Sequence, residues 1–311
     1  MSALICGSMA YDTIMVFSGR FKDAILPDKV HILNVAFLVP ELRREFGGTA
    51  GNIAYNLNLL LPGAALPMAT VGKDFAAYAE WLDANAIDRR YVKPIPEAYT
   101  AQAYITTDLD DNQITAFHPG AMNHSHLQDI PTAGVRLGCL SPDGREGMLL
   151  HARQMVEAGI PFVFDPGQGL PMFTPEELKT FIAQASYLAV NDYESELLTA
   201  RTGWSLSEIA SRVDALIVTR GAKGSHIFAR NKIYEIPAAH AGALADPTGC
   251  GDAYRGGLLY GLLRGLDWET TGRVAALMGA IKIERPGPQN HRFTFDEFRA
   301  RFKKEFRYDL G

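Results

Sequence analysis

The chain has 311 residues, 47% of them hydrophobic and 21% charged, which is typical of a globular protein long enough for one large α/β domain and a smaller excursion. Its formal charge is −5, from 30 basic and 35 acidic side chains, so no overall basic field favours nucleic acid as a partner. The sequence lacks a membrane-length apolar run, a signal peptide and the cysteine spacing of zinc or redox sites, and we therefore expect a cytoplasmic protein without a membrane partner.

The chain opens with an apolar segment, residues 3–8, that ends in small residues in the manner of a buried strand ending at a site. Asp12 follows this segment. Charged residues just beyond the carboxyl end of a parallel strand tend to face the ligand crevice. Asp12 is therefore a candidate ligand contact, with an aspartate in a surface turn as the alternative.

Two segments, residues 13–39 and 99–118, contain strand-like pieces without convincing helices between them. The first holds apolar runs at 14–17 and 31–37, and the second places a hairpin around the turn residues 108–112, whose acidic cluster lacks the length of a calcium loop. We expect both segments to pair into a small β-sheet lid over a crevice. The main domain then comprises residues 1–12, 40–98 and 119–311.

Between these segments, residues 46–60 have the pattern of a glycine joint followed by a helix. Gly47 and Gly48 supply a flexible joint, Thr49 is the expected N-cap, and an apolar stripe continues to the end of the helix. Asn52 falls in the first turn, where its amide can reach a ligand held at the helix N-terminus. The plainer alternative is a capping or solvated asparagine.

From residue 134 onward, short apolar runs alternate with helical segments, the pattern of a parallel sheet covered on both faces. Ligands gather at the carboxyl ends of such strands, where Gln168, Asn191 with Glu194, and the segment 219–224 stand. The expected strands are 69–72, 135–140, 162–167, 187–191 and 215–219, and the expected helices are 74–86, 146–158, 175–185, 194–201 and 207–211.

Two further patterns favour a structural interpretation. His124 and His126 have a metal-like spacing, but they stand in a polar stretch with no further ligand nearby. Near the C-terminus, basic residues alternate with Phe298, Phe302 and Phe306, which indicates an amphipathic terminal helix rather than a nucleic-acid arm.

The most informative stretch is DPTGCGDAYRGG, residues 246–257. Gly249 and Gly251 allow backbone N–H groups to converge on an anion just before a helix, and Asp252 is suited to act as a base toward a hydroxyl. Tyr254 stands where a dinucleotide fingerprint needs its third glycine, and the chain has no Gly-Lys-Ser/Thr of a Walker loop. The alternative is a plain glycine-rich loop in which Asp252 only caps the helix.

Together, FGGTAGN at 46–52 and DPTGCGDAYRGG at 246–257 resemble the two signatures of the ribokinase, or PfkB, family of carbohydrate and nucleoside kinases. Further motifs stand in the family's order: NDYE at 191–194, VTRGAKGS at 218–225, and a small-residue helix at 275–283 that runs into RPGPQN. The resemblance covers nearly the whole chain. It implies an α/β fold, a ribokinase-like three-layer α/β/α domain with a mainly parallel central sheet and a small β-sheet lid.

The resemblance also implies roles for individual residues. Asp252 would be the general base, and the N–H groups of Gly249, Cys250 and Gly251 would hold the phosphoryl group of ATP. Asn191 and Glu194 would act on Mg²⁺ through water, and K⁺ could bind near Asp246. The substrate would be held by Asp12, Gly48 and Asn52 with Gly47–Gly48 as the hinge, and ATP by Thr219, Gly221, Gly224, Ala275, Met278 and Asn290.

Cys250 departs from the alanine that is frequent in this family. A thiol beside the N-terminus of a helix is open to partial ionisation. We therefore hypothesise that oxidation or alkylation of Cys250 blocks activity.

Within the family, residues 108–122 and DPGQ at 165–168 look most like nucleoside kinases of adenosine-kinase type. Phe117 and Phe37 could stack on a base, with packing inside the lid as the alternative, and Gln168 could meet the substrate or the γ-phosphate. We expect 5′-phosphorylation of a ribonucleoside, adenosine first. The alternatives are a kinase of ribose or another sugar and a non-catalytic nucleoside-binding protein. A homodimer through the lid is a further expectation from the family.

Overall fold

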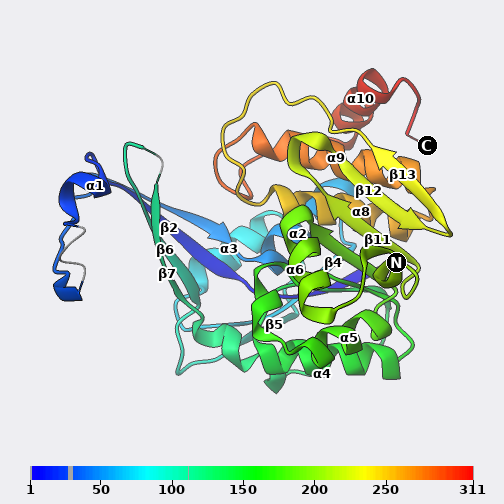
Figure 1. The fold of residues 1–311 in the computed structure, drawn as a ribbon, viewed down its shortest axis with the longest axis horizontal. Helices are drawn as coiled ribbons and strands as arrows, with labels where there is room; N and C mark the ends of the chain where they lie inside the picture. Colours follow the sequence, from blue (N-terminus) through cyan, green and yellow to red (C-terminus); the bar gives the residue numbers. More distant parts are fainter. Residues whose placement is uncertain (1, 27–30, 111, 311) are drawn as a thin grey trace.

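The computed structural model describes residues 2–26, 31–110 and 112–310 (Figure 1). Its strands are β1 (Ser2–Cys6), β2 (Ala10–Val16), β3 (Glu41–Gly47), β4 (Ala65–Val71), β5 (Tyr91–Pro94), β6 (Ala101–Thr107), β7 (Gln113–His118), β8 (Val135–Leu140), β9 (Phe162–Phe164), β10 (Tyr187–Asn191), β11 (Ala215–Thr219), β12 (Ser225–Ala229) and β13 (Lys232–Ile236). Its α-helices are α1 (Phe21–Ala24), α2 (Thr49–Leu60), α3 (Ala76–Ala84), α4 (Arg145–Glu157), α5 (Pro175–Gln184), α6 (Asp192–Thr202), α7 (Leu206–Ala210), α8 (Cys250–Arg264), α9 (Trp268–Ile283) and α10 (Phe295–Phe306), and its 3₁₀ helices include η2 (Gly120–Leu127), η3 (Gly167–Met172) and η4 (Gly221–Lys223).

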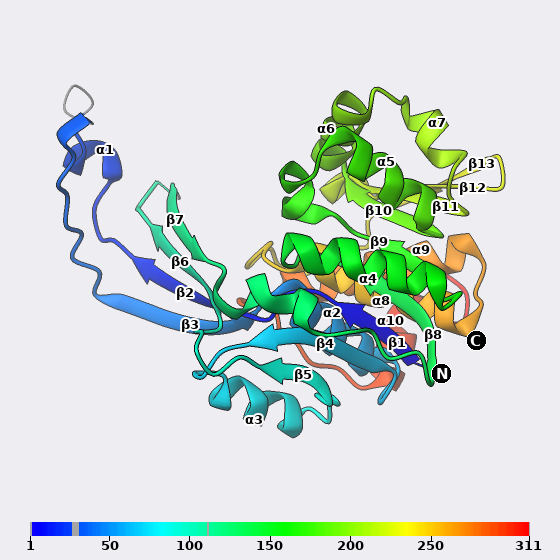
Figure 2. The same ribbon diagram turned by 90° about the horizontal axis from the view of Figure 1, so that it is seen from below.

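The large sheet has the strand order β13-β12-β11-β10-β9-β8-β1-β4-β5. All of its pairs are parallel except those that β12 makes with β11 and β13. Alternate residues of β1 enter two different cores, Ala3 and Ile5 the one beneath α2, α8 and α9, and Leu4 and Cys6 the one beneath α4 and α5. Helices therefore cover both faces (Figure 2), which confirms the predicted three-layer α/β fold.

The smaller sheet has the order β3-β2-β6-β7 and projects from the large one (Figure 1). The hairpin of β6 and β7 confirms the strands expected in the second lid segment. The strand predicted at 31–37 is wrong, because the partner of β2 is β3. Most of β3 is exposed and charged, so it lacks the apolar pattern on which the prediction depended. The small sheet thus includes residues 10–12 and 41–47, beyond the predicted lid bounds, and the division into domains and the homodimer through the lid stay predictions.

Phe37 packs inside the outer part of the lid instead of facing a ligand. Its ring centroid lies 4.9 Å from that of Phe17 and 5.1 Å from that of Phe21. The proposed stacking of Phe37 on a base is therefore wrong, and the alternative of a small aromatic core is correct. In the acidic turn, Asp108 accepts hydrogen bonds from the backbone N–H groups of Asp110 and Asn112, while Asp111 lies outside the described residues.

The lid joins the large sheet through a glycine that no other residue can replace without strain. Gly48 has φ +83°, and a Cβ there would lie 2.6 Å from the backbone of Ser8, Met9 and Ala10. Gly48 is also the N-cap of α2, so the prediction of Thr49 at this position is wrong. The Thr49 hydroxyl instead donates to the carbonyl oxygen of Pro142, 3.1 Å away.

Several smaller predictions are confirmed or corrected. The terminal helix forms as α10, with Phe298 and Phe302 buried. The strand predicted at 69–72 begins earlier, at Ala65, and the helix predicted at 74–86 is shorter, Ala76–Ala84. Within the described part of the chain, no helix has the length and apolarity that crossing a membrane requires.

Helices α2 and α8 pack in direct backbone contact, which brings the two signature motifs together. Gly256 of α8 faces the backbone of α2, and a Cβ there would lie 2.6 Å from the Cβ of Asn56 and 3.0 Å from the N of Leu57. Only a glycine permits this separation of the helices.

We predict that Gly256→Ala lowers the free energy of unfolding by about 1–3 kcal/mol, because the added methyl group overpacks the contact between α2 and α8. Gly279→Ala in α9 is the matched control, since its Cβ would lie 3.7 Å from the nearest heavy atom, the carbonyl oxygen of Cys250. Urea unfolding measures both variants. Equal stabilities would contradict the steric argument.

Candidate active site

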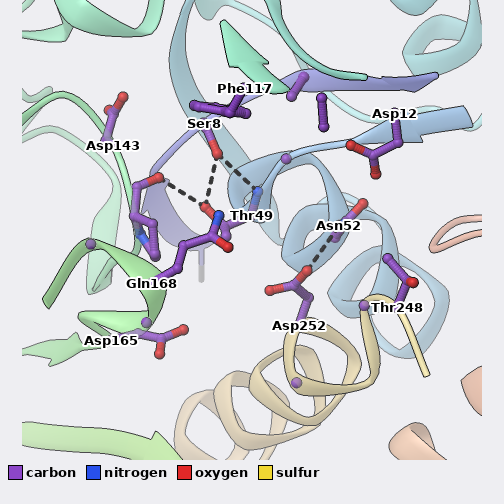
Figure 3. A pocket seen from close by; sticks show the side chains of 18 of the residues that line it. Ser8, Asp12, Thr49, Asn52, Phe117, Asp143, Asp165, Gln168, Thr248 and Asp252 are labelled. Atoms are coloured by element: carbon purple, nitrogen blue, oxygen red, sulfur yellow. Dashed lines mark hydrogen bonds between the residues drawn. The ribbon is translucent and has the colours of Figure 1, made fainter. Parts of the chain in front are cut away.

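A cavity of about 770 Å³ lies between the lid and the carboxyl ends of the large sheet's strands (Figure 3). The lid contributes residues of β2, β6 and β7, and the large sheet contributes residues at or just after the carboxyl ends of β8, β9, β10 and β11. The N-terminal ends of α2 and α8 complete the wall. Segments far apart in the sequence therefore meet at one site, as expected at the strand ends of an open α/β sheet.

At the centre of the cavity, Asn52 faces Asp252 (Figure 3). The Asn52 Nδ2 donates to the Asp252 Oδ2 at 2.8 Å. The orientation of the Asn52 amide is fixed from behind, because Gln289 Nε2 donates to Asn52 Oδ1 at 2.9 Å and Trp81 Nε1 donates to Gln289 Oε1 at 2.9 Å. This chain of hydrogen bonds places one carboxylate oxygen of Asp252 and makes Asn52 a positioning residue.

Burial raises the pKa of Asp252 to about 7. The hydrogen bond from Asn52 and the charge of Arg255 lower this pKa, whereas the charges of Asp165 and Asp12 raise it. Burial also raises the pKa of Asp12 to about 6, with further contributions from Glu45 and Asp246. A carboxyl group with a pKa near neutral is suited to accept a proton at physiological pH.

The loop before α8 partly matches the predicted anion-binding geometry. Gly249 has φ +79° and is the N-cap of α8, and both Gly249 and Gly251 line the cavity. The helix begins at Cys250. The N–H of Cys250 was predicted to hold a phosphoryl group. In the structure it donates instead to the carbonyl oxygen of Pro247 at 3.1 Å.

The predicted partial ionisation of the Cys250 thiol is wrong. Burial raises the pKa of Cys250 to about 11, and the charges of Asp246 and Asp252 add to this effect. The opposing charge of Lys282 does not outweigh them. The thiol is therefore in its unreactive protonated form at neutral pH, and the structure gives no support to the hypothesis that oxidation or alkylation of Cys250 blocks activity.

Asn191 and Glu194 line the cavity and also form the capping box of α6. The Glu194 N–H donates to Asn191 Oδ1 at 2.7 Å, and the Asn191 N–H donates to Glu194 Oε2 at 2.8 Å. Burial raises the pKa of Glu194. Among the residues that the structure describes, no cluster of three or more His, Cys, Asp or Glu side chains could hold a metal by itself, including the region of His124 and His126 in η2. The side-chain oxygens of Asn191 and Glu194 are of the kind that binds Mg²⁺ or its waters, and this role stays a prediction.

The predicted ATP-binding residues divide into two groups. Thr219 lines the cavity, as do Gln168, Gly48 and Phe117 from the substrate set. Ala275 and Met278 do not line the cavity, because both are fully buried where α9 packs against Gly257 of α8. Asn290 also lies outside the cavity wall, and its Nδ2 donates to Glu45 Oε2 of the lid at 2.8 Å. Five other predicted residues are not part of the cavity wall: Gly47, Gly221, Gly224, Asp246 and Cys250.

The sequence analysis missed a buried ion pair at the floor of the cavity. Arg255, one turn after Asp252 in α8, donates from its Nη2 to the Asp165 Oδ1 at 2.9 Å, and the two side chains are 5% and 6% exposed. The sequence did contain one signal for this pair, because Arg255 is a charged residue next to Gly256 and Gly257 in a helix that is otherwise mostly apolar. Asp143 was also missed, a buried side chain in the cavity wall whose pKa burial raises to about 8.

Comparison with known proteins agrees with this geometry. Residues 10–293 match the pfkB family of carbohydrate kinases. A nucleoside kinase of Methanocaldococcus jannaschii is 34% identical over 276 residues, which cover 87% of this chain and 90% of that protein. A structure of Burkholderia thailandensis nucleoside kinase in complex with inosine is 53% identical, with a TM-score of 0.89 and coverage of 99% of both chains. A ribokinase of Lactococcus lactis is 28% identical over 83% of this chain and 86% of its own length.

The fold and the cavity thus define a phosphotransferase that acts on an alcohol group. The chain belongs to the pfkB family of carbohydrate kinases, which confirms the resemblance seen in its motifs. Kinases of this family use ATP, typically with Mg²⁺.

We predict that Asp165→Ala lowers the free energy of unfolding by about 3–5 kcal/mol, because it leaves the Arg255 guanidinium buried without its partner. The double variant Asp165→Ala/Arg255→Met should lose less free energy of unfolding than Asp165→Ala, because it has no unpaired buried charge. Asp83→Ala is the control: it removes the partner of Arg89 from a pair that is about half exposed, and should change stability little. Urea unfolding of all three variants checks this, and a double variant no more stable than Asp165→Ala would contradict it.

Proposed function

We propose that this protein is a nucleoside kinase that transfers the γ-phosphoryl group of ATP to the 5′-hydroxyl of a ribonucleoside. Adenosine is the favoured substrate, with inosine, guanosine and cytidine within its range. The observation that carries the proposal is a row of side chains across the lid. Of the relatives named above, the two with the highest identity to this chain are both nucleoside kinases, and the structure of one of them contains inosine.

The row is set by the strand register of the lid. Glu45 pairs with Asp12, Asp12 with Ala103, and Ala103 with Phe117, so the four residues lie on one face of the sheet. Asp12, Ala103 and Phe117 all line the cavity. Asp12 and Phe117 are two strands apart, roughly 10 Å at the usual strand spacing. The carboxylate can therefore hold ribose hydroxyls while the aromatic ring contacts a base, and the small Ala103 leaves room between them.

In the proposed reaction, Asp252 accepts the proton of the substrate hydroxyl as that oxygen attacks the γ-phosphorus. Asn52 orients the Asp252 carboxylate through the hydrogen bond described above. Backbone N–H groups at the start of α8, near Gly249 and Gly251, face the side on which negative charge develops. Mg²⁺, held through water near Asn191 and Glu194, would neutralise charge on the phosphate oxygens.

A sugar kinase is the second candidate, and the similarity to a ribokinase favours it. Free ribose would use Asp12 and Asn52 but would leave the wall formed by Ala103, Ile105 and Phe117 without a partner. A non-catalytic nucleoside-binding protein is the third candidate. It gives no reason for a carboxyl group with a raised pKa beside an open anion-binding loop.

We predict that ADP release with Mg²⁺-ATP is fast with adenosine and other ribonucleosides and slow with free ribose. Phe117→Ala should raise the KM for nucleosides about fivefold, which corresponds to ~1 kcal/mol of lost stacking. Tyr104→Ala is the matched control, because Tyr104 lies on the opposite face of β6 and is 42% exposed. A response to free sugars alone would show that the nucleoside assignment is wrong.

We predict that kcat/KM falls as the pH drops below about 7, because protonation of Asp252 removes the base. In Asn52→Ala this fall in kcat/KM should begin at a higher pH, because the hydrogen bond that is lost lowers the pKa of Asp252 in the wild type. Asp252→Asn should reduce turnover by about 10²–10⁴-fold while calorimetry still detects nucleoside binding. Retained turnover in Asp252→Asn would refute the assignment of the base.

A further inference from the structure

The proposed mechanism gives no role to the buried ammonium group of Lys282. Lys282, near the C-terminal end of α9, is fully buried. Its Nζ donates to the main-chain oxygen of Asp246 at 2.6 Å and to that of Arg285 at 3.3 Å. Burying an ammonium group is costly unless several oxygens compensate it. A lysine in this position therefore indicates a specific requirement for positive charge.

The surroundings of Asp246 do not fit the monovalent cation that the sequence suggested there. Asp246 Oδ1 accepts from the N–H of Thr248 at 2.8 Å, and Oδ2 accepts from the N–H of Gly287 at 2.8 Å. The Asp246 carbonyl oxygen is taken by the Lys282 ammonium. An ion such as K⁺ binds where carbonyl oxygens replace its hydration shell, and here an amino group already occupies that position.

Negative groups around the Lys282 ammonium offset part of the cost of burying it. The ammonium lies near the C-terminal end of α9, where the helix dipole is negative. Burial lowers the pKa of Lys282, and the charge of Arg43 adds to this effect, whereas the negative charges of Asp246 and Glu45 oppose it and favour the ammonium form.

Lys282 also connects the two segments that shape the anion-binding loop. It joins the carbonyl of Asp246, which opens that loop, to the carbonyl of Arg285. The segment after Arg285 supports the loop in turn, since a Cβ on Gly249 would lie only 2.7 Å from the Cβ of Pro288. The position of the helix N-terminus that carries Asp252 thus depends on this contact.

We propose that the Lys282 ammonium is a built-in monovalent cation that holds the 246–251 loop in its phosphate-binding shape, so that the enzyme works without K⁺. The proposal rests on the kinase function proposed above. It assigns Lys282 as a positioning residue that does not touch the substrate.

The test compares the wild-type enzyme with Lys282→Met in tetramethylammonium chloride and in KCl at equal ionic strength. The wild-type rate should be the same in both salts. Lys282→Met should lose about tenfold or more of kcat in tetramethylammonium chloride, as expected when a catalytic loop is misplaced. K⁺ or methylammonium should restore part of that loss. Lys303→Met, at a side chain that is 62% exposed, is the matched control and should behave as the wild type.

Thermal unfolding in the same salts gives a readout that does not depend on turnover. KCl should raise the Tm of Lys282→Met more than tetramethylammonium chloride does, and should have no such effect on the wild type. If Lys282→Met does not fold, the same comparison is made with Lys282→Arg, which keeps the positive charge and should remain active without K⁺. The wild-type rate in the two salts then tests the proposal independently of any variant.

A wild-type enzyme that needs K⁺, or a Lys282→Met variant that is fully active without it, would overturn the proposal. If no nucleoside or sugar is phosphorylated at all, the proposed function fails, and the salt dependence of the Tm still tests the role of Lys282.

Discussion

The hydrogen bond between Asn52 and Asp252 is the contact on which the active site depends, because it joins two residues 200 positions apart. It forms only because α2 and α8 approach so closely that Gly256 lies against the backbone of α2. The hydrogen bonds from Trp81 and Gln289 then fix the Asn52 amide. The core packing of two helices thereby sets the position of a reactive carboxyl group.

The cavity is strongly acidic for a site that receives a nucleotide. Five carboxyl groups line it, and Arg255 is the basic side chain among its described lining residues. Because Asp165 pairs with Arg255, little of that positive charge is available to a phosphate group. Such a site favours a divalent cation as the partner of the phosphates, and the charges of Asp165 and Asp12 add to the burial that raises the pKa of Asp252.

The lid shows where prediction from sequence pattern reaches its limit. The hairpin of β6 and β7 was predictable, since alternating residues flank a polar turn. The strand β3 was missed because its residues are mostly charged and exposed, so that hydrophobic periodicity carries no signal. The strand β3 is defined only by its pairing with β2. The same pairing places Glu45 and Asp12 in the row that ends at Phe117.

The sequence by itself determined the α/β fold, most strands of the large sheet, the two glycine-rich motifs and the candidate base Asp252, because each depends on local periodicity or on a residue type with special backbone freedom. The tertiary structure alone decided which residues meet. It excluded Ala275, Met278 and Asn290 from the cavity, revealed the Arg255–Asp165 pair, and placed the Lys282 ammonium on the loop of Asp246. Those contacts join positions 36 to 90 residues apart, and their energy comes from burial and charge in the folded core, which no local pattern records.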